Sequence, residues 1–105
     1  MAIGEPMKIR AAVAGDTTEI KVLMNHEMET GQRKDAKGET IPAWFIQSVN
    51  VTWNGKSVLS AQWGPAVAKN PFVSFKFKGG AKGDKVSITW VDNRGDARAD
   101  EAVIA

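Results

Sequence analysis

Residues 44–63, WFIQSVNVTWNGKSVLSAQW, decide the fold because they predict a β-hairpin in the middle of the chain. The turn is Asn54-Gly55, a residue pair that strongly favours a two-residue type I′ turn, since both central residues of that turn need φ > 0. Apolar and polar residues alternate on either side of it, which is the period of a β-strand. We therefore expect antiparallel strands over residues 44–53 and 56–63.

The same alternation recurs along the rest of the chain, and no segment shows a convincing helical period. The predicted strands are 7–14, 18–24, 44–53, 56–63, 72–78, 84–92 and 97–104. This pattern predicts a single domain, residues 1–105, with an all-β fold: an immunoglobulin-like antiparallel β-sandwich of about seven strands. The chain has no Cys, so the prediction depends on strand number and alternation and not on the Cys…Trp…Cys signature of antibody domains.

Three connections are expected at one end of the sandwich. If each connection reverses the chain direction, residues 25–43, 64–71 and 93–96 share an end, and loops gathered on a rigid scaffold often bind partners. Pro65 and Pro71 fix their own φ angles, and Pro71 keeps Asn70 out of the α region. We therefore expect residues 64–71 to be ordered and close to residues 25–31 and 93–96, and the charged residues 33–39 to be mobile.

Both faces of the predicted hairpin are apolar. With a two-residue turn, Trp53 opposes Lys56 and Val51 opposes Val58. One face then carries Phe45, Val49, Val51, Trp53 and Val58, and the second carries Trp44, Ile46, Leu59, Ala61 and Trp63. A two-layer sandwich buries one face of each sheet, and an exposed apolar patch marks an interface. We expect a partner subunit to cover the second face. A β-bulge that changes the parity, and with it a wholly internal core, is the alternative.

The composition excludes several kinds of chemistry. The 14 basic and 12 acidic residues are mixed along the chain and give a net charge of +2, so no nucleic-acid partner is expected. Without Cys there is no thiolate nucleophile, no disulfide and no covalently carried sulfur. With one His, no Tyr and no Ser in a nucleophile motif, we expect no catalytic residue, no cofactor and no metal site.

The remaining ionisable residues are expected to be structural or solvated. His26 is expected to be hydrogen-bonded locally or to contact a partner. Asp92, Asp96, Asp100 and Glu101 alternate with Arg94 and Arg98, which predicts a solvated surface of compensating charges. The chain lacks an N-terminal apolar segment and any stretch approaching about 20 apolar residues, so the residues alone predict a soluble protein without a membrane partner.

The four Trp residues leave two functions open. Trp90 is expected in the core, since Val86 and Ile88 share its face of a strand. If Trp44, Trp53 and Trp63 are exposed, one function is a free-standing binding module for a sugar or a peptide. The other is a subunit whose aromatic side chains are covered by a second protein.

Three segments resemble the SoxZ family: 26–35 (HEMETGQRKD), 41–46 (IPAWFI) and 63–72 (WGPAVAKNPF). The resemblance runs from about residue 7 to the C-terminus. It implies an immunoglobulin-like subunit that pairs with SoxY, whose C-terminal cysteine carries the sulfur intermediates of thiosulfate oxidation while other Sox enzymes act on them transiently. It also implies a periplasmic location, reached by export together with SoxY. The motif positions implied to matter for assembly are Trp63, Gly64, Pro65, Lys69, Asn70, Pro71 and Phe72.

Overall fold

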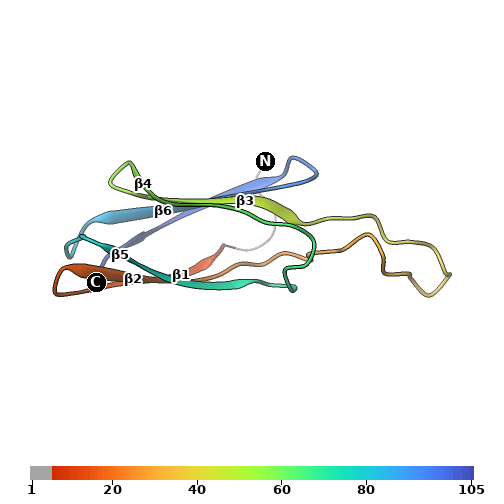
Figure 1. Ribbon diagram of the computed structural model, residues 1–105, viewed down its shortest axis with the longest axis horizontal. Helices are drawn as coiled ribbons and strands as arrows, with labels where there is room; N and C mark the ends of the chain where they lie inside the picture. The colour runs from red at the N-terminus through yellow and green to blue at the C-terminus, as the bar shows by residue number, and fades with distance from the viewer. Residues whose placement is uncertain (1–5) are drawn as a thin grey trace.

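The computed structural model describes residues 6–105 as two antiparallel sheets packed face to face (Figure 1). The strands are β1 (Lys8–Ala14), β2 (Thr17–Leu23), β3 (Ile46–Trp53), β4 (Lys56–Gln62), β5 (Phe72–Lys78), β6 (Lys85–Asp92) and β7 (Ala97–Val103). One sheet has the order β1-β2-β5 and the other β4-β3-β6-β7. The predicted all-β sandwich of seven strands is confirmed. In the described part of the chain, no helix is long and apolar enough to cross a membrane.

The central strands supply most of the core. Their inward side chains alternate with exposed or half-buried outward ones, as the period of two requires, except at the start of β3, where the register against β6 shifts between Ile46 and Ser48. The fully buried apolar residues of these strands are Ile20 and Val22 of β2, Ile46, Val49 and Val51 of β3, and Val86, Ile88 and Trp90 of β6. Burying each large apolar side chain contributes about 1.5–3 kcal/mol, so this cluster holds the two sheets together.

The β3–β4 hairpin has the predicted turn but not the predicted register. Asn54 and Gly55 have φ angles of 48° and 83°, and Trp53 pairs with Lys56. The register then shifts, because β4 contains a bulge, and Val51 pairs with Leu59. The expectation that Val51 opposes Val58 was wrong. Residues that pair directly share a face, so Leu59 faces the sandwich interior together with Val51, and the hairpin has no second apolar face.

The three connections predicted to share an end do so. The Asn70 N–H donates to the His26 carbonyl at 2.9 Å, which joins residues 64–71 to residues 25–31. The Asn93 N–H donates to the Phe45 carbonyl at 3.0 Å, which places the β6–β7 turn beside the start of β3. We call this end of the sandwich, formed by residues 24–28, 43–45, 63–71 and 92–96, the loop end.

Residues 29–44 form a long two-stranded arm that projects from the loop end (Figure 1). Glu29 and Trp44 pair at its base, and Lys34 and Thr40 pair near its tip. The Asp35 side chain accepts the N–H groups of Lys37 and Glu39 at 2.9 and 3.1 Å and so shapes the turn. The arm makes the molecule elongated, with extents of 54 × 23 × 20 Å. Residues 33–39 are exposed, and their mobility stays a prediction.

One side of the sandwich is closed and the other is open. On the closed side β1 lies against β7, and the Ala105 N–H donates to the Ala11 carbonyl at 2.9 Å. On the other side the sheets end in β5 and β4, and neither of these edges pairs with a further strand in residues 6–105. We call this second side the open side.

The loop between β5 and β6 requires glycine for two separate reasons. Gly80 has φ +93°, and a Cβ built there would lie 2.1 Å from Thr18 Oγ1. That hydroxyl is buried and donates to the Gly79 carbonyl at 2.7 Å. Gly83 has nearly the same φ, +91°, but no heavy atom within 4 Å of a built Cβ.

Gly80→Ala should therefore destabilise the fold by more than Gly83→Ala. Both changes carry the strain of a side chain at positive φ, about 1–2 kcal/mol, but only Gly80→Ala also displaces the Thr18 hydroxyl. We expect an additional loss of about 1–3 kcal/mol for that displaced hydrogen bond. Urea unfolding of both variants measures the difference. Equal losses of unfolding free energy in the two variants would show that the contact with Thr18 does not exclude a side chain at position 80.

Candidate functional site

A buried carboxylate lies at the centre of the loop end. Asp92 is 1% exposed and accepts four hydrogen bonds. Its Oδ2 accepts the ring N–H groups of His26 at 3.0 Å and Trp44 at 2.7 Å. Its Oδ1 accepts the backbone N–H groups of Arg94 and Asp96, both at 2.9 Å. Asp92 therefore connects the end of β6 to the segments that follow β2 and precede β3.

His26 is buried and both of its ring nitrogens are occupied. Nδ1 accepts the Met28 N–H at 3.0 Å, so the ring proton lies on Nε2, which donates to Asp92. A general base needs a free nitrogen within reach of substrate, and this ring has none. The pair is therefore structural, which agrees with the expectation that His26 is hydrogen-bonded locally.

Aromatic rings enclose the pair. The His26 ring centroid lies 5.0 Å from that of Trp44 and 5.1 Å from that of Trp90, with the Trp90 contact edge to face. The Arg94 guanidinium lies 4.3 Å from the Trp44 ring centroid, at cation–π distance. Trp44 is thus held from both directions, by a hydrogen bond through its N–H and by a cation near its ring.

The prediction that Asp92 belongs to a solvated charged surface was wrong. Burial raises the pKa of Asp92, but the hydrogen bonds from His26, Trp44 and the backbone N–H groups of Asp96 and Arg94 outweigh it and lower the pKa below the usual 3.8. The carboxylate is therefore held ionised inside the protein. Farther along β7, Arg98 and Asp100 do compensate each other, with Nε and Oδ2 2.8 Å apart.

The 63–72 motif is anchored to the same loop end by Asn70. Asn70 has φ +51°, a left-handed conformation that Asn tolerates better than most residues. Its Oδ1 accepts the His26 N–H at 3.1 Å. Pro71 is buried, and its carbonyl accepts the Met24 N–H at 2.9 Å. Lys69 is exposed and pairs with Glu27 at 3.3 Å. The segment is therefore bonded to residues 24–27 at several points.

The structure does not bring the predicted partner-binding residues onto one surface. Ile46 is 0% exposed, so the prediction that it lies on an outer apolar face was wrong. The reason is a second irregularity, in the pairing of β3 with β6, where the register shifts between Ile46 and Ser48. Leu59 and Trp63 are half-buried against the core on the open side. Phe72 is 62% exposed and lies on the outer face of the three-stranded sheet, since it pairs with Leu23. Trp44, Gly64, Pro65, Lys69 and Asn70 lie at the loop end.

The Trp side chains do not form one binding site. Trp90 is fully buried, as predicted. Trp53 lies at the end of the sandwich opposite the loop end, where its Nε1–H donates to Asp84 Oδ2 at 2.8 Å and lowers the pKa of that carboxyl. Trp44 and Trp63 are therefore separated from Trp53 by the length of β3. Residues 6–105 also contain no group of three or more His, Cys, Asp or Glu side chains that could hold a metal ion.

Asp92→Asn should destabilise the protein strongly although it conserves shape. Whichever way the amide is turned, its NH₂ group faces two N–H donors that need an acceptor. We expect a loss of about 3 kcal/mol in unfolding free energy, measured by urea titration. Asp96→Asn is the matched control, because only the backbone of Asp96 takes part in the network, and it should change stability by less than about 0.5 kcal/mol.

The pH dependence of the unfolding free energy should include a contribution from Asp92. Because its pKa is lowered from 3.8 on folding, it stabilises the fold above that pH and loses this effect as the pH falls through the folded-state pKa. Between about pH 5 and pH 2, the unfolding free energy of the wild type should fall more steeply than that of Asp92→Asn. Parallel curves would contradict an ionised, stabilising Asp92.

Comparisons with known proteins show what this chain is similar to. A comparison with curated protein sequences found no significant match. Several solved structures share the fold, including these three. A hypothetical protein, PH1083 from Pyrococcus horikoshii OT3, is 16% identical, with a TM-score of 0.61 over 96% of this chain and 88% of that chain. A superoxide reductase in the oxidised state is 15% identical, with a TM-score of 0.60 over 94% and 86%.

The third, a superoxide reductase (neelaredoxin) from Archaeoglobus fulgidus in the reduced form, is 17% identical, with a TM-score of 0.59 over 94% of this chain and 86% of that chain. At such identities the likeness concerns the fold alone. The family comparison is more specific, because the description "Sulphur oxidation protein SoxZ" matches residues 7–103. That match includes the loop end, the arm and all seven strands. The chain therefore belongs to the SoxZ family.

Proposed function

We propose that this chain is the non-catalytic subunit of a SoxYZ sulfur-carrier heterodimer. Its family belongs to the sulfur oxidation system. The chain has no Cys, so a carrier that holds sulfur on a cysteine needs a second protein to supply the thiol. In this proposal SoxY supplies it, in the periplasm, and other Sox enzymes meet the pair only transiently.

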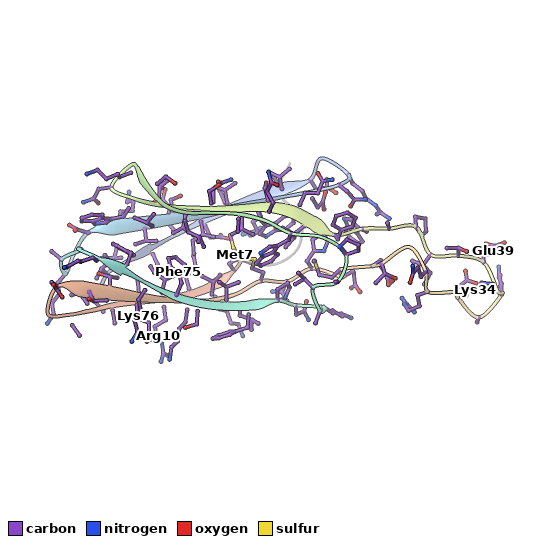
Figure 2. The ribbon with its side chains drawn as sticks, viewed as in Figure 1. Met7, Arg10, Lys34, Glu39, Phe75 and Lys76 are labelled. Carbon is purple, nitrogen blue, oxygen red and sulfur yellow. The ribbon has the colours of Figure 1, made fainter. Side chains whose placement is uncertain are left out.

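The open side is the observation that carries the proposal. The inward side chains of β5, which pair with the buried face of β2, are Val73, Phe75 and Phe77. All three are only half-buried, although their strand faces the core, and Figure 2 shows Phe75 between the two sheets. Leu59 and Trp63 are half-buried from the side of β4. Apolar side chains left incompletely covered along one side of a sandwich are suited to burial by a partner.

The edge of β4 lacks charge and Pro, two of the features that keep a free edge from pairing. Natural edge strands carry charges or Pro to prevent association, yet residues 57–62 contain neither. The charged residue of β4 is Lys56, at the hairpin turn. A bulge is the one protective feature present. An uncharged edge beside apolar side chains matches the depletion of charge at the centre of stable interfaces.

The loop end adjoins the open side through the connection from β4 to β5. Residues 63–71 run between the two edges, with Trp63 at the start and Asn70 bonded to His26 near the end. Pro65 is exposed, and Gly64 is half-buried. Such a bonded segment loses little further conformational freedom when a partner binds, which favours affinity. We therefore place the SoxY contact along β4 and the 63–71 connection.

Leu59→Asp should weaken pairing with SoxY much more than Ser60→Asp does. The two changes introduce the same charge one residue apart, but Leu59 faces the sandwich interior at the open side, whereas Ser60 lies on the outer face of the sheet. Loss of an interface anchor costs about 2 kcal/mol, or roughly 30-fold in affinity. The measurement is titration calorimetry or co-elution of the coexpressed pair. Trp63→Ala, which adds no charge, should also weaken pairing.

Folding is monitored separately by circular dichroism and urea unfolding, so that a misfolded variant is not counted as a pairing defect. Equal effects of Leu59→Asp and Ser60→Asp would remove the open side as the interface. A wild-type chain that is monodisperse alone and does not co-elute with a SoxY subunit would contradict the proposed function itself.

A further inference from the structure

The outer face of the three-stranded sheet is basic. Strand register places six charged side chains on it, five basic and one acidic: Lys8, Arg10, Glu19, Lys21, Lys76 and Lys78. Figure 2 shows Arg10 and Lys76 pointing away from the sandwich on this face. The whole chain has a net charge of only +2, so positive charge is concentrated here. We call this surface the basic face.

The arrangement of these charges is unfavourable within the domain. Arg10 pairs directly with Lys21 across β1 and β2, and like charges directly opposite destabilise a sheet. Lys21 has one partial compensation, Glu19 at 3.7 Å. Among the described residues, no carboxylate lies within 4 Å of Arg10, Lys8 or Lys76. Lys78 has a second partial compensation, Asp16 at 3.9 Å. The other three basic side chains of the face have no ion-pair partner in the described chain, so they are available to a partner.

The basic face also has a hollow and an apolar end. A depression of about 300 Å³ is lined by Lys8, Ile9, Arg10, Lys21, Leu23 and Phe72. Phe72, 62% exposed, is one of the two large apolar side chains that the described chain leaves in water. Leu23 pairs with it from β2. Cations thus surround a site where an apolar side chain can be buried.

The outer face of the other sheet provides the contrast. Two rows of paired residues cross all four of its strands: Gln62, Ser48, Val91 and Ala97 form one, and Ser60, Asn50, Thr89 and Ala99 the other. None of the eight is charged. The cationic character therefore belongs to one sheet and is not a general property of the surface.

We propose that the basic face binds an extended acidic segment of a partner protein, with one apolar side chain of that segment seated against Leu23 and Phe72. Alternate side chains of an extended segment project on one side about 6.5–7 Å apart. Lys8 and Arg10 have this spacing along β1, as do Lys76 and Lys78 along β5. Carboxylates at alternate positions therefore match the basic side chains in spacing and in charge.

Other anionic partners fit less well. A single-stranded nucleic acid gains much of its affinity from bases stacked on aromatic rings, and Phe72 alone offers little surface for such stacking. A membrane surface would need a larger apolar area than Leu23 and Phe72 provide. This inference does not rest on pairing with SoxY, because it uses the outer face and not the open side.

The test is a titration of the ¹⁵N-labelled full chain with a capped decapeptide that alternates Glu with Ser and contains one Leu. Amide shifts should be saturable, weaken with added salt and be confined to β1, β2 and β5. A peptide with Gln in place of Glu should not bind. The double variant Arg10→Glu, Lys21→Glu should lower affinity at least about tenfold, since it replaces two attractions by repulsions.

Lys34→Glu combined with Lys37→Glu is the matched control, because it changes net charge equally on the arm, where Figure 2 shows Lys34 near the tip. It should leave affinity within about twofold. Four outcomes would overturn the proposal. Both double variants could weaken binding equally, or the amide shifts could spread over both sheets. The peptide could fail to bind saturably at millimolar concentration, or a single-stranded oligonucleotide or anionic vesicles could bind more tightly than the peptide. Arg10→Glu, Lys21→Glu should still co-elute with SoxY. Loss of co-elution would assign the face to pairing instead.

Discussion

The loop end depends on one buried negative charge. Asp92 joins three segments that are distant in sequence, and a carboxylate without water is costly unless its oxygens are satisfied. Here both oxygens accept two hydrogen bonds each, from His26, Trp44 and two backbone N–H groups. The base of the arm and the β6–β7 turn are placed by these bonds directly. The 63–71 connection is placed one step further away, through the backbone of His26.

Most of the fold could be predicted from local sequence. Asn54-Gly55 and the alternation on either side of it predict the hairpin, and the other strands follow from the same period, with ends that differ by one or two residues. The shared loop end also followed from simple chain reversal. What local pattern could not reveal is the register shift between Val51 and Thr52, because a bulge depends on how both strands pack against the opposite sheet. The extra residue in β4 turned Leu59 inward, and a second register shift, between Ile46 and Ser48 in the pairing of β3 with β6, turned Ile46 inward. Together they removed the predicted outer apolar patch.

The site was predicted less well than the fold, although one signal was present. Val86, Ile88 and Trp90 alternate into the core, and continuing that parity by one step places Asp92 inside as well. The neighbouring Asp and Arg residues suggested a solvated surface instead. The ring partners of Asp92, Trp44 and His26, are 48 and 66 residues away in the sequence, so local pattern could not show that they lie close to it. The distribution of charge between the two outer faces likewise appears only once strand order and register are known.

The positions of the four tryptophans have a consequence for optical measurements. The chain contains no Tyr, so its intrinsic ultraviolet emission comes from Trp44, Trp53, Trp63 and Trp90. The rings differ in their surroundings. Trp90 and Trp44 both pack against His26, Trp90 in the core and Trp44 beside Arg94. Trp63 lies on the open side, and the Trp53 ring centroid lies 5.4 Å from that of Phe77 at the far end. Replacing one ring at a time by Phe assigns each spectral component to a place. The protein thus carries built-in fluorophores that report separately on its core, its two ends and the side where a partner would dock.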